Sequence, residues 1–261
     1  MRIIYGFDNL PPLRNPVVTV GSFDGVHAGH RELLAYIVRL AAQQEGESVV
    51  VTFTPHPRTV LDNHGEPVQL LNTLEEKIFL LAKLGIDNLL VVPFTEDFSR
   101  IPAEDFVREC LVGKLGVHSL VVGYNHRFGY RHAGDFSQLE RLRQEFGFST
   151  CEVPKQEVGR DKVSSSVIRR LIATGNLLLA APLLAHPYIA ILHADAAGEL
   201  HKGDPHKLLP PPGDYRVQTE EGERILHIDA SERVSLDPPV KTGEQGNVLI
   251  IFRPHVKIND S

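Results

Sequence analysis

The chain has 261 residues, of which 42% are hydrophobic and 23% are charged, as in an ordinary soluble protein with one large or two smaller domains. Its formal net charge of -6 leaves no general basic field, so nucleic acid is not expected as the main partner. The two cysteines, Cys110 and Cys151, lie far apart without a CxxC pattern, which argues against a disulfide framework and a zinc site. No apolar run reaches membrane-spanning length and the N-terminus lacks a secretory core, so we expect a cytoplasmic protein without a membrane partner.

Short β-branched runs alternate with helical patterns over the first 153 residues, and this alternation predicts a parallel α/β sheet. The sequence Thr73-Leu74-Glu75-Glu76 is typical of a helix-capping box, and Gly147 is expected to end a helix that begins at Asp135. Right-handed crossovers would place the carboxyl ends of the strands along one edge, where ligands of open α/β sheets bind. The expected strands are residues 17–20, 48–53, 89–92, 119–122 and 150–153.

The pattern changes after His186. Short alternating runs separated by connections rich in Pro and Gly, such as Pro210-Pro211-Pro212-Gly213, predict a small all-β module. We therefore expect an α/β domain at residues 1–186 and a small β domain, a reduced barrel, at residues 187–261. The expected strands of the second domain are residues 188–192, 215–219, 224–228 and 248–252.

A glycine-rich stretch, Gly-Ser-Phe-Asp-Gly-Val-His-Ala-Gly-His at residues 21–30, connects the first strand to the first helix. The free amides at a helix start carry the positive end of the macrodipole and can bind phosphate. His27 and His30 are three residues apart, hence on one side of the first helical turn, and Gly29 leaves room for a ligand between them. A tight turn with two exposed histidines remains an equal alternative at this point. A metal pair is disfavoured because no nearby residues complete a ligand set.

Three further polar loops follow expected strands. Residues 54–58, Thr-Pro-His-Pro-Arg, place His56 and Pro57 at the end of the second strand, although prolines also simply end strands. Residues 123–134 place aromatic, amide and cationic side chains between glycines, which suits ring stacking and phosphate contacts. Residues 164–166 are three serines at a helix start, and ordinary N-capping needs only one of them.

The order of these four motifs, GSFDGVHAGH, TFTPHP, GYNHRFG and VSSSVIRR, resembles that of the bacterial bifunctional FAD synthetases, the riboflavin kinase/FMN adenylyltransferases. The resemblance covers about the first 188 residues. It implies a Rossmann-like nucleotidyltransferase domain that joins FMN to the AMP part of ATP, with Mg2+ present, and releases pyrophosphate.

The resemblance also assigns roles to residues. It implies that His27 and His30 contact the ATP phosphates and stabilise the transition state. It implies that Ser165, Ser166 and Arg169 hold the triphosphate, with Ser166 in place of the family's Thr. It places Asn125 in the loop for nucleotide and metal-phosphate binding, and His56 near the flavin. We expect no metal ligand from the protein, with Mg2+ held mainly through the ATP phosphates. The remaining expected ATP- or FMN-binding residues are Gly21, Phe23, Asp24, Gly29, Pro57, Gly123, Arg127 and Phe128.

The resemblance weakens in the C-terminal module. Bifunctional members carry a Gly-x-Pro-Thr-Ala-Asn motif for ATP and metal in a flavokinase barrel, and the Pro-Thr-Ala-Asn segment is absent from residues 189–206. We therefore expect a degenerate kinase barrel that supports the first domain or a contact in a homo-oligomer.

The sequence thus favours an FMN adenylyltransferase without riboflavin kinase activity, acting on the small molecules ATP and FMN. Three alternatives stay open: a bifunctional enzyme with a divergent kinase, a non-catalytic flavin- or nucleotide-binding protein, and a nucleotidyltransferase for another acceptor.

Overall fold

A computed structural model describes residues 1–61, 68–124, 127–130, 133–154, 157–158, 161–240 and 246–253. These residues form two compact units, and neither is one continuous stretch of chain. The first comprises Met1–Phe23, His30–Val68 and Leu80–Gln156, and the second comprises Asp24–Gly29, Gln69–Phe79 and the chain from Glu157 onward. The glycine-rich stretch at residues 21–30 therefore contributes to both units.

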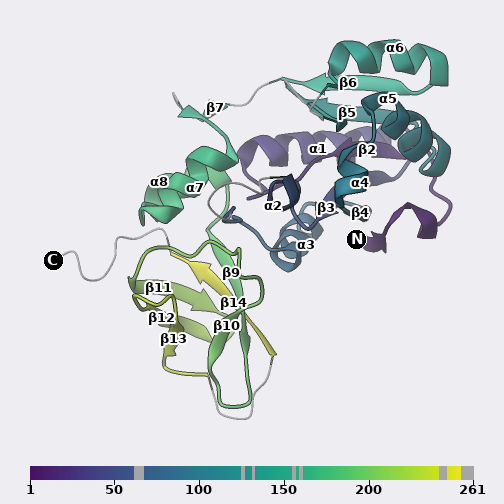
Figure 1. Cartoon of the computed structure of the whole chain (residues 1–261). Coiled ribbons are helices and arrows are strands. Elements are labelled where there is room, and N and C mark those ends of the chain that lie inside the picture. Colours follow the sequence, from purple (N-terminus) through teal and green to yellow (C-terminus); the bar gives the residue numbers. More distant parts are fainter. Residues whose placement is uncertain are drawn as a thin grey trace. The chain divides into compact units, whose positions relative to one another are not determined.

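A six-stranded parallel sheet with strand order β1-β4-β3-β2-β5-β6 organises the first unit. Figure 1 labels five of its strands, β2 to β6. The five expected strands are confirmed, and a sixth, β1, pairs with β4 at one edge. From β2 the sheet continues through β3 and β4 on one side and through β5 and β6 on the other. The loops after β2 and β5 therefore flank the topological switch point, where open α/β sheets bind ligands. The strands are Arg2–Tyr5 (β1), Val17–Val20 (β2), Ser48–Thr54 (β3), Asn88–Pro93 (β4), Ser119–Gly123 (β5) and Ser149–Val153 (β6).

The segments that connect these strands form helices where apolar residues recur at helical spacing, on one face. In α1, Leu33, Leu34 and Ile37 are buried. Asp135 caps α6 by accepting a hydrogen bond from the Gln138 amide at 3.0 Å, and the α6 C-terminus is closed by a left-handed glycine, as expected. The helices are Phe7–Asn9 (η1, 3-10), Ala28–Gln43 (α1), Pro57–Leu61 (α2), Leu74–Ala82 (α3), Glu96–Ser99 (α4), Ala103–Asp105 (α5), Phe106–Lys114 (η2, a π-helix) and Phe136–Phe146 (α6).

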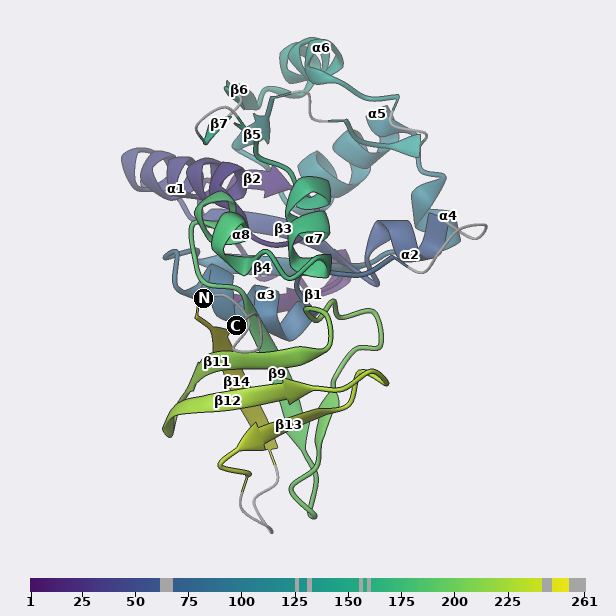
Figure 2. The same ribbon diagram turned by 90° about the vertical axis from the view of Figure 1, so that its left-hand side faces the viewer.

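The second unit contains a closed antiparallel barrel with strand order β10-β13-β12-β11-β14-β9, and Figure 2 shows β11, β12 and β13 in succession. The expected small β-barrel is confirmed, with two short strands, β10 and β13, added to the expected four. The strands are Ile189–Ala194 (β9), Leu200–Lys202 (β10), Gly213–Thr219 (β11), Gly222–Ile228 (β12), Val234–Asp237 (β13) and Gly246–Phe252 (β14). The unit also includes a hairpin of Glu157–Val158 (β7) and Asp161–Lys162 (β8) and the helices Ser165–Ala173 (α7) and Leu177–Leu184 (α8).

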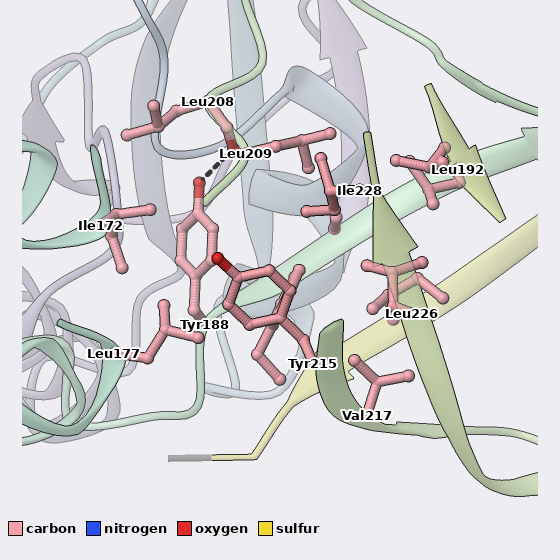
Figure 3. Close-up of a cluster of buried hydrophobic side chains, with 14 of the residues drawn as sticks. Ile172, Leu177, Tyr188, Leu192, Leu208, Leu209, Tyr215, Val217, Leu226 and Ile228 are labelled. Atoms are coloured by element: carbon pink, nitrogen blue, oxygen red, sulfur yellow. Dashed lines mark hydrogen bonds between the residues drawn. The ribbon is translucent and has the colours of Figure 1, made fainter. Parts of the chain in front are cut away.

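One hydrophobic core joins the barrel to α7 and α8. Ile172 and Leu177 from the helices pack in the same cluster as Leu192 and Leu226 from the barrel (Figure 3). The Tyr188 hydroxyl donates a hydrogen bond to the Leu208 carbonyl at 2.7 Å, so this buried phenol is satisfied. Helices α7 and α8 therefore belong to the same packed body as the barrel.

Candidate active site

The first part of the glycine-rich stretch continues directly from β2. The Gly21 amide donates to the Val51 carbonyl at 3.0 Å, which extends the β2–β3 ladder by one residue. Phe23 is buried, and its ring meets the His30 ring edge to face at a centroid distance of 5.2 Å. His30 lies in the first turn of α1 and is half-buried. The Phe23 ring therefore helps to fix the orientation of the imidazole that the sequence assigns to ATP phosphate.

The backbone at residues 23–26 takes an uncommon path. Phe23, Gly25 and Val26 have φ values of 49°, 88° and 39°. Positive φ is rare for non-glycine residues and especially unfavourable for a β-branched one such as Val26. A Cβ atom on Gly25 would also lie 2.7 Å from Leu71 Cδ1. The surrounding contacts must therefore stabilise this strained conformation.

Asp24 is the anchor of the strained turn. It is 2% exposed, and its Oδ1 accepts hydrogen bonds from the amides of Leu71 at 2.9 Å and Asn72 at 3.1 Å. Its Oδ2 forms an ion pair with the Arg169 guanidinium at 2.8 Å. The sequence predicts that Asp24 binds ATP or FMN, whereas its carboxylate faces three protein donors. Its geometry is that of a residue that organises the site.

The same anchor gathers two of the predicted triphosphate-binding residues. Ser165 Oγ donates to the Asp24 carbonyl at 2.8 Å, and Arg169 Nε donates to the Gln69 carbonyl at 2.6 Å. Ser164 caps α7 through the Val167 amide at 3.4 Å. Ser166 is exposed. The three serines are thus distinct in position, and only Ser164 is needed as the N-cap.

His27 immediately precedes α1 and is 7% exposed. Burial lowers its pKa from 6.5 to about 4, the negative charge of Asp24 opposes this shift, and His186 adds to it. The imidazole is therefore neutral at pH 7 in the absence of ligand. In that state it offers one N–H donor and one acceptor nitrogen, and carries no positive charge.

Sequence reasoning missed two other titratable residues of the second unit. His186 lies with Nε2 at 2.9 Å from the Gly25 carbonyl and Nδ1 at 2.7 Å from the Pro187 carbonyl. Lys77 in α3 is 5% exposed, and burial lowers its pKa to about 8 although Asp24 raises it. Neither position carries a recognisable motif, because each reaches the glycine-rich stretch only through the tertiary fold.

The remaining predicted residues are more dispersed, and those that the structure describes lie in the first unit except Gly29, which belongs to the second. His56 accepts from the Arg58 amide at Nδ1, 3.2 Å away, and Pro57 begins α2. Gly123 ends β5. Exposed Arg127 pairs with Asp135 at 3.1 Å, whereas the Phe128 ring is buried in the core. Gly29 lies in the first turn of α1. Asn125 falls outside the described residues.

The residues that the structure describes contain no group of three or more His, Cys, Asp or Glu side chains placed to hold a metal ion. None of the helices within the described ranges combines the length and apolar character needed to cross a bilayer.

A parallel sheet with a glycine-rich turn at its switch point defines a Rossmann-like nucleotide-binding domain. The model of the FAD synthetase family matches residues 11–167, which is more than half of the chain. The protein belongs to the FAD synthetase family.

Curated relatives and a solved structure extend this result. The chain is 37% identical over 187 residues to a bifunctional riboflavin kinase/FMN adenylyltransferase from Listeria monocytogenes, covering 70% of this chain and 59% of the relative. It is 35% identical over 203 residues to the protein of the same name from Escherichia coli K12, covering 76% and 64%. The matches thus span about three fifths of the relatives' length. A crystal structure described as a macrolide-efflux protein from Streptococcus pneumoniae has a TM-score of 0.80 at 21% identity and covers 98% of this chain and 91% of its own, which shows that the fold is shared.

Proposed function

We propose that the protein is an FMN adenylyltransferase that transfers AMP from ATP to FMN, giving FAD and pyrophosphate. Family membership supports this activity, and the observation that carries it is the cluster of Asp24, Ser165 and Arg169 at the glycine-rich stretch. Asp24 holds both the Arg169 guanidinium and the Ser165 hydroxyl at 2.8 Å. This arrangement preorganises the Arg169 guanidinium beside the N-terminus of α7, whose first residue is Ser165, and a cation next to free helix amides is the chemistry that a triphosphate requires.

The reaction needs positioning more than covalent participation by the protein. A phosphate oxygen of FMN attacks the α-phosphorus of ATP, the new P–O bond forms in line, and the bond to the β-phosphate oxygen breaks to release pyrophosphate. Negative charge shifts onto the nonbridging oxygens and the leaving group. Preorganised donors that meet these oxygens lower the barrier, and loss of one such donor typically reduces turnover about 100-fold or more.

The described side chains suit different parts of this task. A guanidinium has five N–H groups, and the contacts of Arg169 with Asp24 and Gln69 use two of them, so others can meet phosphate oxygens. His27, as a neutral imidazole, adds no positive charge to the site. His30 projects from the first turn of α1, whose amides attract anions. We treat Mg2+ as part of the Mg–ATP substrate, where it neutralises phosphate charge.

We further propose that the chain lacks riboflavin kinase activity. The Pro-Thr-Ala-Asn segment of the family's ATP- and metal-binding motif is absent from residues 189–206. At the end of this stretch the His206 carbonyl accepts a hydrogen bond from the Leu70 amide, and the next residue, Lys207, forms a buried ion pair with Glu76. These contacts are structural, which supports loss of the ligand-binding role.

One experiment tests both proposals. Purified protein is incubated with ATP and Mg2+ plus either FMN or riboflavin, and the flavins are separated by chromatography. We expect FAD and pyrophosphate from FMN, no phosphorylated product from riboflavin, and loss of FAD formation in His30→Ala.

Each alternative has its own signature. Production of FMN from riboflavin would establish a bifunctional enzyme. Tight FMN binding without FAD would favour a non-catalytic flavin-binding protein. Pyrophosphate release that depends on an acceptor other than FMN would indicate a different nucleotidyltransferase.

A further inference from the structure

The Leu71 peptide links two polar clusters of the second unit. Its N–H donates to Asp24 Oδ1 at 2.9 Å, and its C=O accepts from Lys207 Nζ at 2.7 Å. Asp24 belongs to the candidate phosphate site, whereas Lys207 lies in the connection between β10 and β11 of the barrel. One residue of backbone therefore joins the barrel to the anchor of the glycine-rich stretch.

Lys207 is an unusual side chain for a barrel connection because it is 2% exposed. Its Nζ lies 2.6 Å from Glu76 Oε2 and 2.8 Å from the Ile189 carbonyl, in addition to its bond with Leu71. These three acceptors match the three N–H groups of an ammonium. Burial lowers the pKa of Lys207, and the Glu76 carboxylate opposes that shift. The Tyr188 ring adds a cation–π contact, with Nζ 4.4 Å from its centroid.

Glu76 extends the network back to the same segment of chain. Its Oε2 also accepts from the Thr73 amide at 3.1 Å and from Asn72 Nδ2 at 3.3 Å, and its Oε1 accepts from the Ile191 amide at 2.9 Å. The backbone amide of Asn72 is the second donor to the Asp24 carboxylate, beside that of Leu71. Both amides that orient the Asp24 carboxylate therefore belong to residues held by Lys207 or by its partner Glu76.

A short backbone ladder fixes the register of this connection. The Leu70 amide donates to the His206 carbonyl at 2.7 Å, and the Leu208 amide donates to the Leu70 carbonyl at 2.9 Å. Lys207 lies between His206 and Leu208, the two residues that bond to Leu70. These backbone bonds therefore hold Lys207 beside Leu71, whose carbonyl accepts from its Nζ. The ladder and the ion pair together leave the 69–72 segment little freedom.

We propose that Lys207 is a positioning residue for adenylyl transfer: it fixes the Leu71 peptide and Glu76, which orient Asp24 and, through Asp24, hold Arg169 and Ser165. This inference rests on the proposed function for its kinetic consequence. The barrel would then act on the reaction through Lys207.

The test compares Lys207→Met with Lys202→Met, a matched control in the same barrel. Lys202 also forms an ion pair, with Glu232, but none of the described hydrogen bonds or ion pairs joins either of these residues to residues 69–72. A milder variant, Lys207→Gln, keeps one donor group and removes the charge if the methionine variant does not fold. All variants are checked for native circular dichroism before measurement.

The first readout is hydrogen exchange in the ligand-free protein, which needs no activity. In the wild type we expect the Leu71 and Asn72 amides to be among the most protected of the second unit. In Lys207→Met or Lys207→Gln their exchange should accelerate about tenfold or more relative to barrel amides, whereas Lys202→Met should leave it unchanged. Rapid exchange of both amides in the wild type would by itself overturn the proposal.

The second readout is steady-state kinetics with ATP and FMN varied separately. We expect the Lys207 variants to raise the KM for ATP about tenfold or more and to leave the KM for FMN within about twofold, while Lys202→Met changes neither. Equal effects of the Lys207 and Lys202 variants in an active enzyme would contradict a positioning role. If the wild type forms no FAD, the proposed function fails, and the exchange measurements still decide whether Lys207 positions the Asp24 anchor.

Discussion

Replacement of Glu76 by Gln is a stringent test of the buried network because it changes almost no volume. Glu76 has 0% exposure, and both carboxylate oxygens accept hydrogen bonds from the protein. Oε1 faces the Ile191 amide, and Oε2 faces Lys207 Nζ and the Thr73 amide. A Gln side chain has one oxygen and one NH2 group, so either orientation of the amide places a donor against a donor.

The expected loss of stability follows from these contacts. Glu76→Gln leaves the Lys207 ammonium buried without a charge partner, and breaking a buried pair in this way typically costs about 3 to 5 kcal/mol. Domains unfold with about 5 to 15 kcal/mol in total, so the loss is a large fraction of the stability. For a protein of this size it corresponds to a fall of about 6 to 20 °C in the melting temperature.

The neighbouring residue provides the control. Glu75 lies in the same turn of α3, has a side chain that is 43% exposed, and is 3.8 Å from His193 Nε2. Glu75→Gln removes the same charge from an exposed position, so we expect a loss below about 1 kcal/mol. Thermal and urea unfolding followed by circular dichroism measure both variants. If Glu76→Gln were no more destabilising than Glu75→Gln, the buried pair would not stabilise the unit as argued.

Three further predictions concern the glycine-rich stretch. Gly25→Ala adds a Cβ atom 2.7 Å from a leucine methyl carbon at a φ of 88°, and it should lower the free energy of unfolding, measured by thermal unfolding, by about 2 to 4 kcal/mol. The control is Gly85→Ala, whose Cβ meets nothing within 4 Å at a φ of 75°, and it should lower that free energy by about 1 to 2 kcal/mol. The folded protein lowers the pKa of His27 from 6.5 to about 4, so the contribution of His27 to the free energy of unfolding is complete above pH 6.5 and is lost as the pH falls toward 4. Between pH 7.5 and 4.5 the wild type should therefore lose up to about 3 kcal/mol more stability than His27→Gln. Parallel stability–pH profiles of the two proteins would contradict this. Arg169→Ala should lower kcat/KM about 100-fold, whereas Arg170→Ala, an exposed neighbour, should stay within about threefold; similar losses in both would remove Arg169 from the phosphate site.

Local patterns were sufficient to predict most of the fold. The strand at residues 48–53 is continuous and rich in β-branched residues, and its first five residues are buried. The capping box forms as expected, with the Glu76 backbone amide donating to Thr73 Oγ1 at 3.2 Å. The strands that the sequence did not predict are short or exposed: β1 has one buried residue in four, and β10 has three residues. Such segments carry little periodic signal, and only pairing with neighbouring strands defines them.

The sequence named candidate site residues, but it did not predict the contacts that the structure shows among them. The family resemblance placed Asp24 among the expected ATP- or FMN-binding residues. Its actual partners lie 47, 48 and 145 residues further along the chain, at Leu71, Asn72 and Arg169. No local pattern reports such distant contacts. For the same reason the capping box revealed Glu76 as a helix cap but not as the partner of Lys207, 131 residues away.

Under the proposal that the barrel has lost its kinase motif, the buried lysine gives a physical reason for the barrel to persist. When a ligand-binding motif is lost, its side chains are no longer required for binding. The space that they occupied must still be filled, and the buried carbonyl groups around it must still accept hydrogen bonds. At Lys207 the ammonium satisfies Leu71 and Ile189 carbonyls and neutralises Glu76, so the segment now stabilises the unit from within. Under the positioning proposal, deletion of the barrel would expose these groups and release the Leu71 and Asn72 amides from their register. The Asp24 anchor would then lose its preorganisation, and adenylyl transfer would fail together with folding of the second unit.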